Sequence, residues 1–303
     1  MCEADRAARS GMHVERSIGN LHSLLPKHLE KKMTARRSAI RCFSILISSA
    51  VAVYAFAQTP KPEFKPEVGQ SGKDVVWVPS PQELVDKMLD MAGVTLKDYV
   101  IDLGSGDGRT VITAAKRGAR ALGVEFNPDM VALSRRNAAA AGAGDKATFV
   151  EADIFRTDLS QATVITLFLL TELNLRLRPT ILSLKPGTRI VSNTFRMGEW
   201  EPDQTAELGC DTYCTAYMWI VPARVDGRWK TAQGELTLKQ EFQKVSGTLT
   251  SGNVAAPISK GSLRGDQIRF TAAGAEYRGR VNGETIEGTL KSAGNPGSWK
   301  ATR

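Results

Sequence analysis

An apolar run that ends in three glycines at alternate positions constrains this chain more than any other feature. Residues 100–109 read Val-Ile-Asp-Leu-Gly-Ser-Gly-Asp-Gly-Arg, and a helical pattern follows at once. So tight a turn from a strand into a helix needs residues without a Cβ, and it leaves bare backbone against which a ligand can lie. The free N–H groups of the new helix face the same loop. The segment predicts an α/β fold with a ligand-binding loop; a glycine-rich turn without a ligand is the alternative.

The spacing of the glycines bears on which ligand the loop accepts. A dinucleotide-binding loop follows G-x-G-x-x-G, which would put the third glycine at position 109. Arg109 stands there, and Gly108 is the third glycine. A nicotinamide-dependent oxidoreductase is therefore the weaker interpretation. The next expected strand, 120–125, ends in Glu125, whose carboxylate can accept hydrogen bonds from both hydroxyls of a ribose.

The net charge of +8 lies mostly near the amino terminus. Residues 1–57 hold nine Lys or Arg and four Asp or Glu, whereas residues 58–303 hold 31 and 28. The body of the chain is almost balanced in charge, so we expect no nucleic-acid partner.

The amino-terminal segment has the pattern of an export signal. Arginines precede a largely apolar run over 42–57, which ends in the small-x-small sequence Ala55-Phe56-Ala57 of a signal-peptidase site. We predict a signal peptide over 33–57 with cleavage near Ala57–Gln58, which places the protein outside the cytoplasm, in the periplasm or cell envelope. The alternatives are an uncleaved anchor, through which alone the chain would contact a membrane, and a cytoplasmic protein.

Two flanking segments complete this prediction. Because Met33 stands where a signal peptide should begin, we expect residues 1–32 to be an upstream over-extension of the reading frame. Residues 58–73 are rich in proline and predict an extended linker.

Histidine and cysteine narrow the chemistry further. All three histidines precede Met33, which excludes Ser-His-Asp and Cys-His catalysis and His-based metal sites from the predicted mature chain, and we expect no metal. Cys210 and Cys214 can bridge across a turn in an oxidising compartment or remain two buried thiols.

Strands alternate with helices between residues 74 and 225. Apolar runs predict strands over 99–103, 120–125, 147–151, 164–170 and 188–192, with helices between them, and a closing antiparallel pair over 208–221. This order predicts a mostly parallel sheet with right-handed crossovers. Ser80-Pro81-Gln82-Glu83 predicts a helix start, with Ser80 as the N-cap of a capping box.

Helical periodicity ends near residue 225. Short alternating stretches separated by glycine-bearing turns follow, and they predict a small antiparallel β domain over 226–303, a meander or partial barrel. Trp229 and Trp299, at its two ends, are expected to close its core. We expect this domain to stabilise or space the molecule.

The pattern D-x-G-x-G-x-G with an acidic residue at the end of the next strand resembles class I S-adenosylmethionine-dependent methyltransferases. Val78-Pro79-Ser80-Pro81, the segment 123–128 and the segment 192–203 together resemble a narrower family. These are the lysine methyltransferases that act on the ATP synthase c-subunit and the adenine nucleotide translocase, with their bacterial relatives. The resemblance covers roughly residues 77–221 and implies a Rossmann-like sheet, mostly parallel with an antiparallel closing strand, and S-adenosylmethionine as cofactor.

The resemblance also implies roles for particular residues. Glycines of the loop would let backbone approach the methionine part of the cofactor, Glu125 would hold the ribose, and Asp153 with Ile154 would contact the adenine. The implied cofactor-binding residues are Asp102, Gly104, Ser105, Gly106, Gly108, Glu125, Asn127, Asp153 and Ile154. No catalytic residue is assigned; the implied candidates for the acceptor pocket are Phe168, Glu172, Asn174, Phe195 and Trp200.

Two interpretations of function follow. The first is an S-adenosylmethionine-dependent methyltransferase whose unknown acceptor is expected to be a protein lysine. Thr171 stands where relatives are expected to carry proline, so the exact pocket shape is not fixed by the resemblance. The alternative is an exported binding module that keeps the fold without catalysis.

Overall fold

The computed structural model describes residues 64–210, 212–292 and 295–303. The predicted over-extension, the signal peptide and residues 58–63 of the linker fall outside these ranges. Within them, no helix is long and apolar enough to cross a lipid bilayer.

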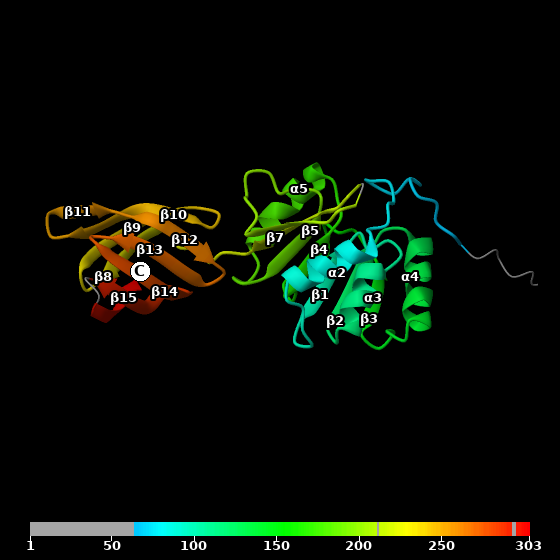
Figure 1. Ribbon diagram of the computed structural model, residues 1–303, viewed down its shortest axis with the longest axis horizontal. Helices are drawn as coiled ribbons and strands as arrows, with labels where there is room; N and C mark the ends of the chain where they lie inside the picture. The colour runs from blue at the N-terminus through cyan, green and yellow to red at the C-terminus, as the bar shows by residue number, and fades with distance from the viewer. Residues whose placement is uncertain (1–63, 211, 293–294) are drawn as a thin grey trace, which may run out of the picture. The chain divides into compact units, whose positions relative to one another are not determined.

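Seven strands form the first sheet, in the order β3-β2-β1-β4-β5-β7-β6 (Figure 1). The first five pair in parallel and β7 runs antiparallel to both β5 and β6, which confirms the predicted sheet with its antiparallel closing strand. The strands are β1 Tyr99–Leu103, β2 Arg120–Glu125, β3 Ala147–Glu151, β4 Val164–Leu167, β5 Arg189–Asn193, β6 Gln204–Glu207 and β7 Thr215–Ile220.

Helices cover both faces of this sheet. Val100 packs in one apolar cluster with residues of α2 and α3, whereas its neighbour Ile101 packs in another with residues of α5. Successive side chains of a strand point to opposite faces, so strands buried on both sides need apolar residues at almost every position. The helices are α2 Gln82–Met91, α3 Arg109–Lys116, α4 Pro128–Ala140 and α5 Thr171–Leu182.

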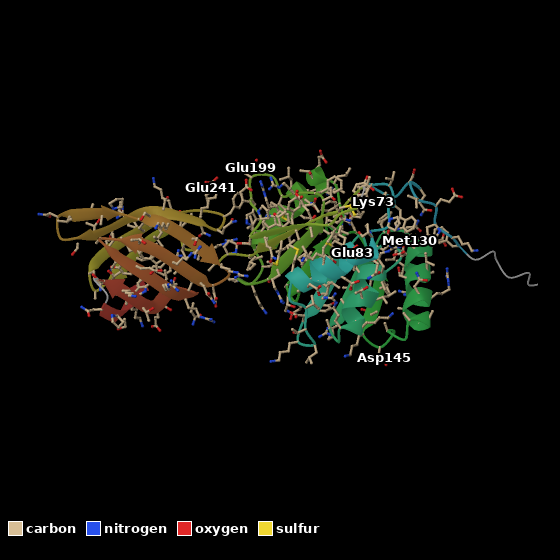
Figure 2. The ribbon with its side chains drawn as sticks, viewed as in Figure 1. Lys73, Glu83, Met130, Asp145, Glu199 and Glu241 are labelled. Carbon is tan, nitrogen blue, oxygen red and sulfur yellow. A yellow bond between two sulfur atoms is a disulfide. The ribbon has the colours of Figure 1, made fainter. Side chains whose placement is uncertain are left out.

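The carboxyl ends of the parallel strands share one edge of the sheet. Lys73 and Met130 lie at this end, whereas Asp145, just ahead of β3, lies at the amino end (Figure 2). In an open α/β sheet, ligands bind outside the carboxyl ends of the strands. The topology therefore points to the end near Lys73 as the place for a site.

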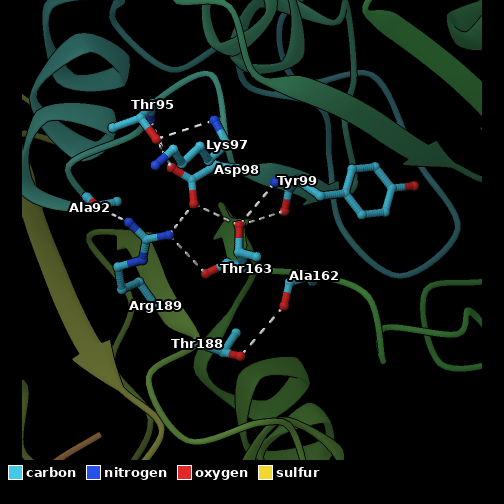
Figure 3. Close-up of polar contacts among 9 residues, drawn as sticks. All are labelled: Ala92, Thr95, Lys97, Asp98, Tyr99, Ala162, Thr163, Thr188 and Arg189. Carbon is cyan, nitrogen blue, oxygen red and sulfur yellow. Dashed lines mark hydrogen bonds and ion pairs between the residues drawn. The ribbon is translucent and has the colours of Figure 1, made fainter.

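A polar network ties β1, β4 and β5 together at the opposite, amino end (Figure 3). Asp98 is buried and forms an ion pair with Arg189, and it also accepts hydrogen bonds from Thr95 and from the hydroxyl of Thr163. Arg189 donates further to the carbonyl oxygen of Ala92 at 2.6 Å. Burial raises the pKa of Asp98, but the hydrogen bonds and the guanidinium outweigh it and leave the pKa below its ordinary value.

Nine antiparallel strands form a second sheet, and eight of them close into a ring because β9 pairs with β10. The predicted antiparallel domain is confirmed, but it is closed rather than partial; β11 pairs with β10 outside the ring. The strands are β8 Gly227–Thr231, β9 Gly234–Glu241, β10 Lys244–Ser251, β11 Val254–Pro257, β12 Ser259–Arg264, β13 Gln267–Ala272, β14 Ala275–Asn282, β15 Thr285–Ser292 and β16 Asn295–Thr302.

Aromatic side chains fill the core of the closed sheet. Trp229 and Trp299, which lie near the two ends of this domain in the sequence, are both buried in one apolar cluster. Phe270 stacks on Tyr277 with ring centroids 4.7 Å apart, and Trp299 meets both rings edge-on. Each indole N–H donates to a backbone carbonyl, of Val225 or Arg278 respectively. The second sheet therefore has an apolar core of its own, built largely of aromatic side chains.

Two local predictions were wrong. Helix α2 begins after Pro81 without a side-chain cap, because Ser80 is buried and its hydroxyl accepts instead from the side chain of Asn193. The closing strand pair, predicted over 208–221, begins earlier, because its first strand is the polar β6, which ends at Glu207.

Candidate functional site

A cavity opens at the carboxyl ends of β1 to β4 and is bordered by the segment ahead of α2. The glycine loop after β1, the residues that follow β2 and β3, and the end of β4 all reach it. Of the nine predicted cofactor-binding residues, all but Gly108 line this cavity: Asp102, Gly104, Ser105, Gly106, Glu125, Asn127, Asp153 and Ile154. The structure thus gathers on one surface residues that the chain spreads over fifty positions.

The glycine loop adopts a conformation that other residues rarely take. Gly104 and Gly106 have φ of 81° and 54°. A Cβ on Gly106 would lie 2.7 Å from the indole nitrogen of Trp77, so a side chain there would collide with the wall of the cavity. Backbone is therefore exposed to the cavity between Trp77 and the strand end.

Gly108 has a different position from its two neighbours. It is the N-cap of α3 with φ of 83°, and its Cβ would lie 2.8 Å from the ring of Phe149. The third glycine thus permits close packing of the helix start on β3, and it lies off the cavity lining.

Arg109 links the glycine loop to the segment ahead of α2. Its guanidinium binds the carboxylate of Asp107 at 2.6 Å and donates to the carbonyl oxygen of Ser80, also at 2.6 Å. Ser80 in turn bonds Asn193 at the end of β5. Two of the sequence segments that carry the family resemblance, around Pro79 and after Ser192, therefore meet at the glycine loop.

Glu125 links the loop to the end of β2. One carboxylate oxygen accepts from the backbone N–H of Gly106 at 3.0 Å, and the other accepts from Phe126 and Asn127 at 2.9 and 3.0 Å. A carboxylate offers about four acceptor positions, so the oxygen facing Gly106 keeps one for a hydroxyl in the cavity. This geometry fits one hydroxyl of a ribose, because backbone N–H groups take the other acceptor positions.

Asp153 closes the far end of the cavity together with Lys73. The Lys73 ammonium lies 2.8 Å from the Asp153 carboxylate and 4.7 Å from the centre of the Phe126 ring. The hydrogen bond from Lys73, with one from the backbone of Phe155, holds the pKa of Asp153 below its ordinary value. Ile154 adds an apolar wall beside these groups. A flat ring with an exocyclic amine suits this combination of carboxylate, aromatic ring and aliphatic side chain.

Asp102 is the buried acid of the motif. Its carboxylate accepts from the hydroxyl of Thr166 on β4 at 2.5 Å. Burial, together with the nearby charges of Glu125 and Asp107, raises its pKa to about 7, against the lowering effect of the Thr166 bond. Asp102 therefore changes charge near neutral pH at the base of the loop.

The remaining loop residue, Ser105, lines the cavity but turns its hydroxyl inward. The oxygen would lie 2.6 Å from a Cβ on Gly123 and has no hydrogen-bond partner within the described part of the chain. Position 123 on β2 must therefore be glycine, because the glycine loop packs directly against it.

The five predicted acceptor residues are not all on the cavity. Phe168 lines it, with Leu169 and Leu173 beside it. Glu172 is exposed in the first turn of α5. Asn174 is buried and donates to the carbonyl oxygens of Phe195 and Arg196, which supports the loop after β5 from behind.

Trp200 belongs to the apolar core. It is fully buried and lies 6.2 Å from Trp219 and 5.9 Å from Phe242, measured between ring centroids. Phe242 comes from the second sheet, so a sequence pattern confined to the first could not show this partner. Phe195 stays near the cavity, with its ring 6.1 Å from that of Phe168.

Three contributors were not predicted as site residues. Trp77 and Lys73 line the cavity from the segment ahead of α2, and Tyr213 contacts Phe168 from the loop between β6 and β7. Lys73 was missed because the prolines of 58–73 predicted an extended linker there. For Tyr213, the sequence offered one signal, the two cysteines on either side of it. A bridge between them would fix the conformation of the loop that carries the tyrosine. No group of three potential metal ligands occurs within the ranges that the structure describes.

Comparison with known proteins agrees with this geometry. A family model described as the ANTKMT methyltransferase domain matches residues 102–204. The chain is 39% identical over 151 residues to a protein-lysine N-methyltransferase of Saccharolobus islandicus, a match that covers 48% of this chain and 94% of that protein.

Two further relatives show the reach of the similarity. The lysine N-methyltransferase of the ATP synthase c-subunit from Mus musculus is 37% identical over 114 residues, which are 37% of this chain and 46% of that protein. A solved structure described as an RNA methyltransferase from Salinibacter ruber with S-adenosyl-L-homocysteine is 47% identical, covering 49% of this chain and 96% of that chain with a TM-score of 0.47. The chain thus spans about half the length of the mouse relative and nearly all of the other two.

Proposed function

The chain belongs to the protein-lysine N-methyltransferase family of S-adenosylmethionine-dependent methyltransferases, and we propose that its own methyl acceptor is the side-chain amine of a protein lysine. The observation that carries this proposal is the composition of one cavity. Polar groups suited to the cofactor line it where β1, β2 and β3 end, and Phe168, Leu169 and Leu173 line it where β4 ends. A long alkyl chain with a terminal amine fits such an apolar end.

S-adenosylmethionine supplies an electrophilic methyl group bound to a sulfonium. The residues of this chain have to bind, orient and keep water out, because methyl transfer needs the reacting atoms in line and little acid–base chemistry. Gly104 and Gly106 would leave room for the methionine part, Glu125 would accept from the ribose, and Asp153 would accept from the adenine amine.

The acceptor amine must lose its proton before it reacts. The apolar walls at Phe168 and Leu173 favour the neutral amine, because removal from water disfavours the charged form. We assign this step to desolvation at these walls, with release of the proton to solvent.

Methyl transfer to matched peptides tests the acceptor. The full chain is incubated with methyl-tritiated S-adenosylmethionine and a library of peptides, each lysine peptide paired with its arginine twin, and RNA is included as a separate acceptor. We expect label in some lysine peptides and in none of their twins. Label confined to RNA or to arginine twins would contradict a lysine acceptor while leaving the methyltransferase activity in place.

We also propose that the protein acts outside the cytoplasm. The predicted signal segment supports this, although it lies beyond the described residues, and so does the disulfide between Cys210 and Cys214, because disulfides persist mainly in oxidising compartments. Cell fractionation with thiol trapping tests it: the expected result is a processed, disulfide-bonded protein in the envelope fraction. A reduced, unprocessed cytoplasmic protein would contradict it.

A further inference from the structure

Three aromatic rings meet at the part of the cavity that Phe168 lines. Phe168 and Tyr213 lie edge to face with centroids 5.1 Å apart, and Phe195 completes the group at 6.1 Å from Phe168 and 6.4 Å from Tyr213. We call these three residues the aromatic triad. Its members follow β4, β5 and β6, so three separate loops converge on one point of the sheet edge.

The backbone next to the triad is conformationally strained at two positions. Thr194 and Tyr213 have φ of 60° and 55°, a conformation that side-chain-bearing residues rarely adopt. The carbonyl oxygen of Phe195 accepts from the hydroxyl of Ser192 at 2.7 Å and from the Asn174 amide at 3.2 Å. Such conformations persist only where the surroundings enforce them, and they gather at binding and catalytic sites.

A disulfide encloses Tyr213. Cys210 and Cys214 are bonded across a separation of four residues, and the backbone N–H of Leu208 donates to the carbonyl oxygen of Cys214 at 2.9 Å. Tyr213 lies inside this small ring and is still 38% exposed. The bond limits the conformations of the loop and thereby the positions open to the tyrosine ring.

We propose that the aromatic triad is the wall along which the alkyl chain of the acceptor amine reaches the cavity, and that the Cys210–Cys214 disulfide positions Tyr213 for this contact. The proposal rests on the lysine methyltransferase function proposed above. Aromatic faces attract an approaching ammonium and offer apolar contact to its methylene chain. Phe168 belongs to both the triad and the cavity, so the wall is continuous with the place of reaction.

Core packing alone accounts poorly for this arrangement. Trp200 and Trp219 show how this protein buries aromatic residues in its core, where both are fully enclosed. Tyr213 remains partly exposed, and Phe168 and Phe195 are half-buried. A wall that meets an incoming ligand needs such exposure.

Binding of a lysine analogue tests the proposal. Nα-acetyl-lysine N-methylamide is titrated into the full chain saturated with S-adenosylhomocysteine, and its dissociation constant is measured by NMR. We expect Tyr213→Ala to weaken binding by about fivefold or more, since a ring contact is lost. Tyr213→Phe keeps the ring, and Thr212→Ala is the matched control in the same loop; both should stay within about twofold of wild type.

Reduction tests the role of the disulfide. Dithiothreitol converts the bond to two thiols and is itself oxidised to its cyclic disulfide. We expect it to weaken binding of the lysine analogue to the wild type, and we expect the Cys210→Ser/Cys214→Ser variant to bind as weakly with or without it. Wild-type affinity that is unchanged by dithiothreitol would overturn the positioning role.

Two outcomes separate this inference from the function on which it rests. If the wild type binds S-adenosylhomocysteine and methylates lysine peptides while Tyr213→Ala binds the analogue as tightly as wild type, the triad is not the acceptor wall. If the wild type binds no S-adenosylhomocysteine, the proposed function itself fails. Affinity for S-adenosylhomocysteine is therefore measured in every variant and is expected to be unchanged.

Discussion

Asp102 sits buried at the base of the glycine loop with a pKa of about 7, well above the ordinary value of 3.8. Between these two values the folded protein keeps a proton that the unfolded chain has released. The free energy of unfolding therefore falls by about 1.4 kcal/mol for each pH unit between about pH 4 and pH 7. Above about pH 7 it stays level. A residue that lowers stability at neutral pH within a ligand cavity is typical of a functional site.

Asp102→Asn should remove this pH dependence. The amide oxygen can still accept from Thr166, so the fold is kept, and the free energy of unfolding relative to wild type should rise by about 4 kcal/mol between pH 4 and pH 8. Urea unfolding of both proteins at several pH values measures the difference. Parallel curves for the two proteins would show that Asp102 ionises normally in the folded state.

Sequence patterns identified residues that share one cavity where backbone geometry demands a residue type. The glycines and the strand-end acids, such as Gly106 and Glu125, reach one cavity because parallel strands end at one edge. Trp200 and Asn174, predicted for the acceptor pocket, are buried and do not line the cavity. Their partners, Phe242 and the carbonyl of Phe195, come from distant or irregular segments.

At the scale of elements, the glycine loop offers a matched pair of substitutions. Gly106 and Gly142 both have positive φ, of 54° and 66°, but a Cβ would meet Trp77 at Gly106 and open space at Gly142. Gly142→Ala should cost about 1 kcal/mol of stability through backbone strain alone. Gly106→Ala should cost more and should also abolish cofactor binding.

Chemical unfolding and a titration with S-adenosylhomocysteine measure both effects. Gly142→Ala should bind S-adenosylhomocysteine as wild type does. Normal binding by Gly106→Ala would mean that the cofactor does not lie against this part of the loop.

The network at the amino end of the strands supplies a second prediction at this scale. Asp98→Ala leaves the half-buried guanidinium of Arg189 without its carboxylate (Figure 3). Loss of one partner of a fully buried pair costs about 3–5 kcal/mol, so we expect a cost at or below the low end of that range. Glu287→Gln breaks an exposed pair with Lys300 and should change stability by less than about 1 kcal/mol. Denaturant midpoints compare the two variants directly.

The free energy of unfolding at acidic pH gives an independent check on Asp98. Its folded pKa lies below 3.8, so its contribution to stability is complete above the unfolded value and is lost as the pH falls below about 3.8 through the folded pKa. Asp98→Asn should therefore lose less stability than wild type in this range. Equal losses would show that the ion pair is not what holds the three strands.

Element boundaries were predictable where the pattern was strong. The parallel strands are largely apolar, and their predicted bounds agree with the structure to within three residues. Strand β6 reads Gln-Thr-Ala-Glu and lies mostly exposed at the sheet edge, so it carries no apolar signal. The capping pattern at Ser80 failed because a buried partner, Asn193, competes for the hydroxyl.

At the scale of the whole molecule, the chain builds two sheets with separate apolar cores. The change from helical to alternating periodicity near residue 225 predicted the second sheet. Its closure through the β9–β10 pairing was not predictable, because local alternation fixes which residues face inward and not which strands meet at the end of the sheet.

The central claim is that the cavity at the glycine loop binds S-adenosylmethionine through Glu125. The direct test is calorimetric titration of S-adenosylmethionine into the full chain and two variants. Glu151 is the register partner of Glu125 on the next strand but lies off the cavity, so Glu151→Gln is the matched control.

We predict that the wild type and Glu151→Gln bind alike. Glu125→Gln should bind at least about tenfold more weakly, because its amide replaces one acceptor oxygen of a charged group with a donor. Equal affinity in all three proteins, or no binding by a folded wild type, would contradict the account.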